Sequence, residues 1–183
     1  SLVLIKPDAI KNSLTGYILS RFSEFHTGLR FAALKVVAVN LALAEAHYAE
    51  HKGKFLYPSL LEYIRGYRHY PDEPSKRRVI AIIYRGPNAI KNIREICGNT
   101  NPHEARAQRP GCIRSLGTII PLYDAKGKFI GDRSDNLIHA SANIQDAERE
   151  SKLWFLPTDI PPTVRSYPAE TSKEYYYYKN GAI

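Results

Sequence analysis

The chain is organised around one stretch, Asn136-Leu137-Ile138-His139-Ala140-Ser141-Ala142-Asn143, which leads into a helical pattern from Ile144 to Phe155. Its apolar start predicts a short strand that reaches His139. Asn143 is a favoured helix N-cap, and Asp146 lies in the first turn of the helix, where negative charge is stabilising. The stretch therefore predicts a strand, a turn and a helix, with one histidine beside their junction.

Earlier segments predict the rest of the sheet and its helices. Leu2 to Ile5 is an apolar run followed by Lys6-Pro7, so Lys6 is expected at a strand terminus. Leu29 to Leu41 and Val79 to Tyr84 predict two further strands. Helices are predicted at Gly16 to Phe25, Ala42 to Lys52, Pro58 to Ile64 and Asn88 to Cys97, with Thr15 and Asn88 as caps and Gly98 as a stop. This order indicates an α+β fold with a repeated split βαβ arrangement.

The remaining segments lack a strong periodicity. Arg65 to Arg78 and Asn99 to Gly117 are polar or basic and predict two loops. Thr118 to Leu122 and Lys128 to Ile130 flank a turn and predict a hairpin. Leu156 to Ile183 is rich in proline and tyrosine, and we expect it to form a tail that wraps its own core or a neighbouring subunit.

Composition narrows the class of protein. With 183 residues, 44% of them hydrophobic and 24% charged, the chain predicts one globular domain plus extensions. It has neither a signal-peptide layout nor the ~18 consecutive apolar residues of a membrane helix, so no membrane partner is expected. Cys97 and Cys112 fit no disulfide framework or metal motif, which favours a reduced cytoplasm. The net charge of +8 favours anionic partners.

Several separated motifs occur together in one order. They are Leu4-Ile5-Lys6-Pro7-Asp8, His47-Tyr48-Ala49-Glu50-His51-Lys52, Gly98-Asn99-Thr100-Asn101-Pro102, Pro110-Gly111-Cys112-Ile113-Arg114, Asn136-Leu137-Ile138-His139-Ala140-Ser141, Ala147-Glu148-Arg149-Glu150 and Leu153-Trp154-Phe155. In these motifs the chain resembles the nucleoside diphosphate kinase family over residues 1 to about 155. The resemblance implies a ferredoxin-like α/β sandwich, with a four-stranded antiparallel sheet covered by helices. It also implies a homo-oligomer, either a hexamer or a tetramer.

The resemblance further implies a reaction. Family members move a γ-phosphoryl group from a nucleoside triphosphate to a nucleoside diphosphate by a ping-pong route through a phosphohistidine, with Mg²⁺ held mainly by the phosphates. His139 occupies the phosphorylated position. Imidazole suits this task because it is substantially neutral near pH 7 and its phosphoramidate remains reactive. No residue is predicted to bind the metal directly.

The predicted catalytic residues besides His139 are Glu150, Lys6, Tyr48 and Ser141. Glu150 matches the family carboxylate that orients the histidine, although a helix carboxylate is more often solvated. Tyr48 matches a tyrosine close to the histidine and fits a core aromatic equally well. Ser141 matches a hydroxyl beside the histidine, and it could equally cap local backbone.

The predicted nucleotide-binding residues are Lys6, Phe55, Leu60, Arg94, Thr100, Arg114 and Asn136. The cations and Thr100 match phosphate and ribose contacts, although each cation alone would suit a solvated surface. Asn136 matches the residue that hydrogen-bonds a sugar hydroxyl. Phe55, Leu56 or Tyr57 could stack on the base; Phe55, with Leu60 as its apolar neighbour, is the favoured choice.

Three features depart from the family pattern. Ala142 replaces the usual aspartate, and the chain between Arg114 and Asn136 is longer than usual, with an inserted hairpin at about 116–131. The third departure is the extension at 156–183, which follows a kinase domain at 1–155. The charge of +8 and the tyrosine-rich tail leave an alternative function, a nucleic-acid-binding or regulatory scaffold that uses the basic surface.

Overall fold

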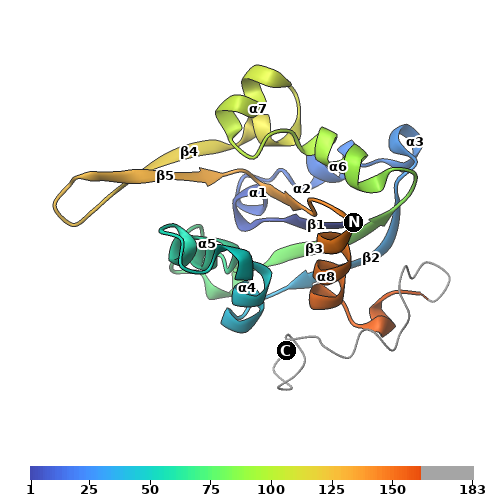
Figure 1. Cartoon of the computed structure of the whole chain (residues 1–183), viewed down its shortest axis with the longest axis horizontal. Helices are drawn as coiled ribbons and strands as arrows, with labels where there is room; N and C mark the ends of the chain where they lie inside the picture. Colours follow the sequence, from blue (N-terminus) through green and yellow to red (C-terminus); the bar gives the residue numbers. More distant parts are fainter. Residues whose placement is uncertain (162–183) are drawn as a thin grey trace.

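The computed structural model describes residues 1–161 of the chain. Its centre is a four-stranded antiparallel sheet in the order β2-β3-β1-β6 (Figure 1). The strands are β1 (Leu2–Ile5), β2 (Arg30–Val37), β3 (Val79–Arg85) and β6 (Ile138–Ala140). The predicted ferredoxin-like α+β fold is confirmed.

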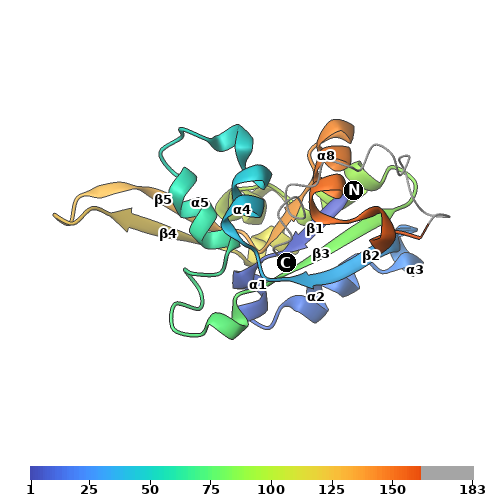
Figure 2. The ribbon, with the colours of Figure 1, turned by 90° about the horizontal axis from the view of Figure 1, so that it is seen from below.

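Helices cover both faces of this sheet (Figure 2). They are α1 (Pro7–Lys11), α2 (Thr15–Arg21), α3 (Glu24–Thr27), α4 (Leu41–His47), α5 (Tyr57–Ile64), α6 (Ala89–Cys97), α7 (Pro102–Gln108) and α8 (Ile144–Trp154). Single 3₁₀ turns lie at Ala49–His51, Pro74–Lys76, Ile113–Leu116 and Pro157–Asp159. No helix within residues 1–161 combines the length and apolar character needed to cross a lipid bilayer.

The alternation of side chains along the sheet produces two cores. Leu2 and Leu4 of β1 pack into a cluster with α4, α5 and α8, whereas Val3 and Ile5 pack into a second cluster with α2 and α6. This is the period of two expected for a strand that is buried on both faces. Trp154 is fully buried in the first cluster and fixes the end of α8 against the sheet.

The prediction of an irregular loop at Asn99 to Gly117 is wrong. The side-chain oxygen of Asn101 accepts hydrogen bonds from the backbone amides of His103 and Glu104, and Pro102 occupies the first turn. An asparagine cap followed by proline is a favourable helix start, and it begins α7 without a strong apolar period.

Other boundaries differ from the prediction as well. Strand β2 ends at Val37 instead of Leu41, because the side chain of Asn40 caps α4. Asn88 has a left-handed backbone and makes no side-chain cap, and Thr15 lies inside α2, so both cap predictions are wrong. The cap at Asn143 and the stop at Gly98 are confirmed.

The predicted hairpin is present as a separate two-stranded sheet of β4 (Thr118–Tyr123) and β5 (Phe129–Asp135). It projects well beyond the helices (Figure 1). At the other end, Ile160 is buried in the first core cluster, so the start of the predicted tail packs against its own domain. The remainder of the tail, residues 162–183, lies outside the described residues.

Candidate active site

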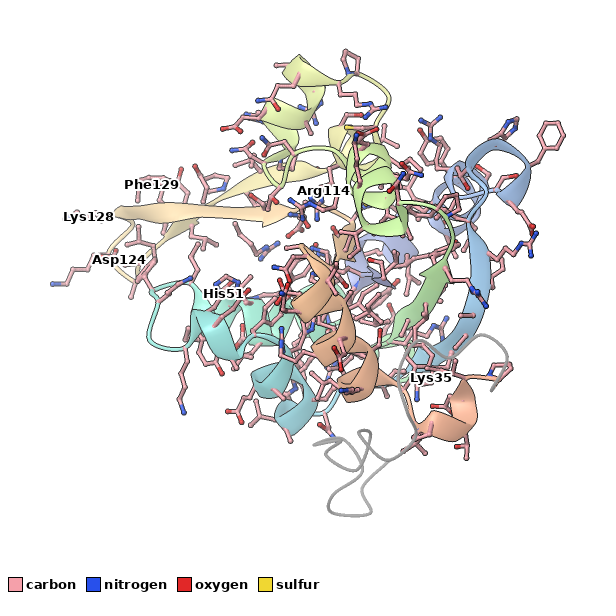
Figure 3. All side chains as sticks on the ribbon, turned by 45° about the vertical axis from the view of Figure 1, so that its right-hand side comes forward. Lys35, His51, Arg114, Asp124, Lys128 and Phe129 are labelled. Carbon is pink, nitrogen blue, oxygen red and sulfur yellow. The ribbon has the colours of Figure 1, made fainter. Side chains whose placement is uncertain are left out.

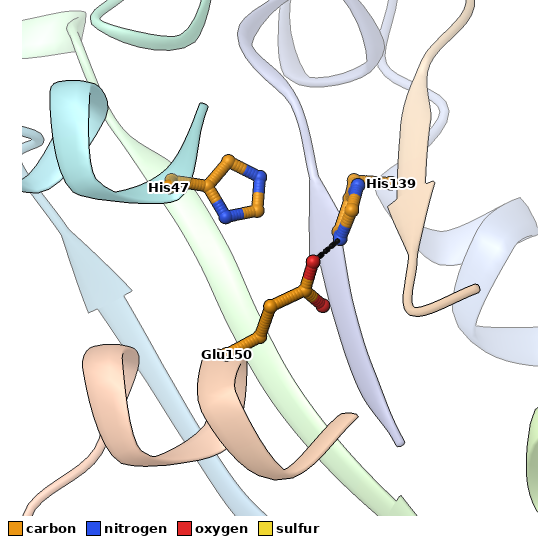
Figure 4. Close-up of side chains that lie close together, drawn as sticks. All are labelled: His47, His139 and Glu150. Carbon is orange, nitrogen blue, oxygen red and sulfur yellow. Dashed lines mark hydrogen bonds and ion pairs between the residues drawn. The ribbon is translucent and has the colours of Figure 1, made fainter. Parts of the chain in front are cut away.

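His139 lies on β6 and faces a carboxylate from α8. Its Nε2 is 2.9 Å from Oε1 of Glu150 (Figure 4), and the Ser141 hydroxyl donates to Oε2 of the same carboxylate at 2.7 Å. An ionised carboxylate only accepts hydrogen bonds, so Nε2 carries the hydrogen and Nδ1 keeps its lone pair. The structure therefore brings three predicted catalytic residues together and leaves one ring nitrogen of His139 available.

Glu150 is only 3% exposed, yet it is held in its charged form. Burial raises the pKa of this carboxyl group, but the charge and hydrogen bond of His139 and the Ser141 hydroxyl outweigh burial and lower the pKa below its ordinary value. A partner that is charged near neutral pH fixes the orientation of the His139 ring.

A second histidine, which the predicted site omitted, packs against the first. The rings of His47 and His139 are 4.5 Å apart at an angle of 81°. The indole of Trp154 donates to Nδ1 of His47 at 3.3 Å, so Nε2 of His47 carries the hydrogen and faces His139 (Figure 4). Burial, and then the charge of His139, lower the pKa of His47 well below its ordinary value. The motif beginning at His47 contained this residue, but nothing in it indicated which ring His47 would contact.

These side chains do not suit a protein-bound magnesium ion. Donor atoms of His47, His139 and Glu150 lie within 4.8 Å of one another, the one such group of three found within residues 1–161. Two imidazoles and one carboxylate favour zinc, whereas Mg²⁺ prefers oxygen ligands. In addition, the hydrogen on Nε2 of His47 occupies the position that a metal would need.

A network of cationic and polar side chains lies next to His139. Lys6, at the end of β1, is 4% exposed and donates from Nζ to Oδ1 of Asn136. Asn136 in turn donates from Nδ2 to the Thr100 carbonyl at 2.8 Å. Arg114 donates to Oγ1 of Thr100 at 3.4 Å and to the carbonyl of Ile138 at 3.2 Å. Four predicted nucleotide-binding residues from separate segments thus form one connected network.

Burial lowers the pKa values of both cations in this network. It lowers the pKa of Lys6 to about 8, a shift that the charge of Asp8 opposes and that of Arg114 reinforces. Burial likewise lowers the pKa of Arg114. Two cations buried side by side favour the binding of a polyanion, because its negative charge relieves both repulsion and desolvation.

Asp8, which the predicted site also omitted, holds the backbone that precedes His139. Its Oδ2 accepts from the Tyr63 hydroxyl at 2.7 Å and from the Leu137 amide at 2.9 Å. Leu137 has a left-handed backbone with a φ of 69°, which is uncommon for a branched side chain. Such strain persists only where neighbouring contacts enforce it, and here the buried Asp8 carboxylate provides the contact.

The structure places four predicted residues outside this network. Tyr48 packs on the His47 ring, with the ring centroids 4.7 Å apart. Phe55 is 66% exposed before α5, and Leu60 lies on α5, partly buried. Arg94 is exposed on α6 and lines a wide groove that extends to the start of α8.

The comparison with protein families identifies the chain. The family described as nucleoside diphosphate kinase matches residues 1–160. The chain belongs to this family. It is therefore a nucleoside diphosphate kinase, a phosphotransferase that acts on nucleotides, and the alternative of a nucleic-acid-binding scaffold is not favoured.

Individual relatives agree with this family membership. The chain is 35% identical to the nucleoside diphosphate kinase of Thermus thermophilus, covering 87% of this chain and 97% of the relative. It is 37% identical to that of Pyrococcus furiosus, covering 87% and 84%. The solved Aquifex aeolicus nucleoside diphosphate kinase superposes with a TM-score of 0.68 at 30% identity, covering 87% and 96%. A transition-state mimic of the Borrelia burgdorferi enzyme with vanadate and ADP gives 0.65 at 29% identity, covering 96% and 95%.

Proposed function

We propose that His139 carries the phosphoryl group between two nucleotides. Its Nδ1 lone pair attacks the γ-phosphorus of a nucleoside triphosphate, the bond from that phosphorus to the β-phosphate oxygen breaks, and a nucleoside diphosphate leaves. A second nucleoside diphosphate then attacks the phosphohistidine through its β-phosphate oxygen and restores the free imidazole. The observation that supports this assignment is the hydrogen bond between Nε2 and Glu150, which leaves only Nδ1 to attack.

Glu150 and Ser141 support the same step in this proposal. When Nδ1 bonds to phosphorus, the ring becomes positively charged, and the Glu150 carboxylate stabilises that charge across a 2.9 Å hydrogen bond. The Ser141 hydroxyl holds the carboxylate in place at 2.7 Å. Tyr48 acts indirectly, because it fixes the His47 ring that packs on His139.

The cations hold the transferred group. We assign Lys6, Arg114, Thr100 and Arg94 to the phosphates, where fixed positive charge balances the negative charge of the transferred group and its neighbours. Asn136 still has one amide hydrogen and one lone pair for a sugar hydroxyl after its bonds to Lys6 and Thr100. The exposed ring of Phe55, with Leu60 further along on α5, receives the base.

Mg²⁺, which the family generally uses with nucleotides, would enter with the nucleotide. Lys6 and Arg114 are cations and cannot bind a metal ion, and this suits a metal held by phosphate oxygens. When bound there, the ion neutralises charge on the phosphates and orients them. Lys6 and Arg114 would then contact the phosphate oxygens that the metal leaves free.

We also propose a homo-oligomer in the cytoplasm. Strand β2 lies at the edge of the sheet and exposes Phe31, Leu34 and Val36, an apolar edge of the kind that usually pairs or is covered. The two cysteines of the sequence are both free and buried, as suits a reducing compartment.

The test is the phosphoenzyme. Incubation with γ-labelled ATP and Mg²⁺ is expected to give a labelled protein whose label is lost in acid and retained in base, as a phosphoramidate requires. His139→Ala should remove the label, whereas His26→Ala, which changes an exposed histidine of α3, should retain it. Labelling of His139→Ala would refute the assignment.

A further inference from the structure

A buried cluster joins the loop at 65–78 to the base of the hairpin. Nε2 of His69 is 2.8 Å from Oδ2 of Asp135, the last residue of β5. Arg133 donates two hydrogen bonds to the same carboxylate, from Nε to Oδ1 at 2.7 Å and from Nη2 to Oδ2 at 3.1 Å. His69 is 8% exposed and Asp135 7% exposed, so these interactions are shielded from water. None of the steps proposed above uses them.

The cluster is firmly built. Burial raises the pKa of Asp135, but the hydrogen bonds from His69 and Arg133 more than offset this and lower the pKa below its ordinary value. On the other side, Lys11 donates to the His69 carbonyl at 2.9 Å, and the Tyr63 ring lies 5.2 Å from the His69 ring. His69 is thus fixed to α1 and α5, and through Asp135 it fixes the hairpin to both helices.

The backbone at Asp135 is confined from a second direction. Gly117 lies so close that a Cβ there would be 2.6 Å from the Asp135 carbonyl oxygen. Asp135 is therefore held by Gly117 through its backbone and by His69 and Arg133 through its side chain. The next residue is Asn136, whose side-chain amide forms hydrogen bonds with Lys6 and with the Thr100 carbonyl. Any swing of the projecting hairpin would reach Asn136 through one peptide bond.

We propose that His69, Asp135 and Arg133 are positioning residues. They hold the Asn136 amide where it can form a hydrogen bond with the sugar hydroxyl of the nucleotide. The cluster isolates Asn136 from motion of the hairpin. This inference rests on the proposed role of Asn136. It predicts an energetic coupling between His69 and one substrate hydroxyl, although the two groups do not touch.

The coupling is measured with the phosphoenzyme. Single-turnover transfer to a nucleoside diphosphate is compared with transfer to its 2′-deoxy and 3′-deoxy forms. Asn136→Ala, run in parallel, identifies the hydroxyl that Asn136 binds, since this variant is insensitive to its removal. With the complete acceptor, His69→Ala should lower kcat/KM about tenfold; with the acceptor lacking that hydroxyl, the loss should shrink to about twofold or less.

Two further variants control the comparison. In His69→Gln the amide nitrogen can occupy the place of Nε2 and donate to Asp135, so it should restore most of the activity. Lys128→Ala removes an exposed side chain at the far end of the hairpin (Figure 3) and should stay within about twofold of the parent on every acceptor. Should His69→Ala fail to fold, Arg133→Gln removes the paired hydrogen bonds from the guanidinium to Asp135 and gives the same comparison.

The outcomes separate this inference from the proposed function. An equal loss with every acceptor would mean that His69 is only structural and would overturn the inference. If Asn136→Ala is as sensitive as the parent to the removal of either hydroxyl, the role of Asn136 fails and the inference fails with it. If Asn136→Ala is insensitive to one hydroxyl while His69→Ala loses equally on every acceptor, the role of Asn136 stands and the inference alone fails.

Discussion

The charge state of Lys6 depends directly on its surroundings. It lies buried at the end of β1, against the Tyr63 ring at 4.3 Å from the ring centroid and bonded to Asn136. Burial lowers its pKa to about 8. Below that pH the ammonium group attracts phosphate, and above it the free enzyme loses this attraction as the proton leaves.

The activity of the enzyme should follow this titration. We expect kcat/KM, which reports ionisations of the free enzyme, to fall as the pH rises through about 8. Lys6→Gln should be less active at every pH and should lose this alkaline decline. The measurement is the pH dependence of kcat/KM for both proteins; a decline of the same midpoint in Lys6→Gln would assign it to another group.

Individual residues were predictable where a motif identified them and unpredictable where packing decided. His139, Glu150, Ser141, Lys6 and Arg114 stood in motifs, and the structure brings them together. The left-handed backbone of Leu137 and its enforcement by Asp8 could not be predicted, because they depend on contacts between residues far apart in the sequence.

At the scale of elements, α8 illustrates what local sequence can specify. Its start depends on Asn143, whose side-chain oxygen accepts from the Asp146 amide at 2.8 Å, as the sequence predicted despite Ala142. This cap also sets where Glu150 lies along the helix. Local hydrogen bonds of this kind can be predicted because donor and acceptor are three residues apart.

Removal of this cap should destabilise the protein measurably. We expect Asn143→Ala to lower the free energy of unfolding by about 1 kcal/mol, whereas Asn143→Asp, which keeps the acceptor, should change it far less. Denaturant unfolding of the three proteins tests this. Equal stability of Asn143→Ala and the parent would show that the cap contributes nothing here.

Element boundaries were less predictable. Helix α7 was expected to be a loop because it carries arginines without an apolar period, yet its cap at Asn101 and proline at 102 were visible in the sequence. The hairpin was predicted from its turn, but its attachment was not. His69 meets Asp135 across 66 positions, and no local pattern encodes such a contact.

For the molecule as a whole, two buried carboxylates should contribute to the loss of stability in acid. Glu150 and Asp135 both have pKa values lowered by their partners, in spite of burial. The unfolded chain would titrate them at about 4. Their contribution to stability is thus complete above that range and is lost as the pH falls through the lower folded-state values.

We therefore expect the free energy of unfolding to decline steeply below about pH 4. Glu150→Gln should be less stable than the parent near neutral pH, and the difference should narrow in acid because the parent loses the same charge. Denaturant midpoints measured from neutral to acidic pH provide the check. A constant difference at every pH would contradict the assignment of this loss to Glu150.

The pairing of β6 with β1 determines when the site can exist. Leu4 pairs with His139, so the first strand and the strand bearing the nucleophile are separated by most of the described chain. Contacts of such large sequence separation carry a high loop-closure entropy cost and slow folding. During synthesis, β1 can pair with β3 but has no partner on its other side until residues 138–140 emerge from the ribosome. A nascent chain that stops short of them lacks residues of both cores, and it cannot yet accept a phosphoryl group.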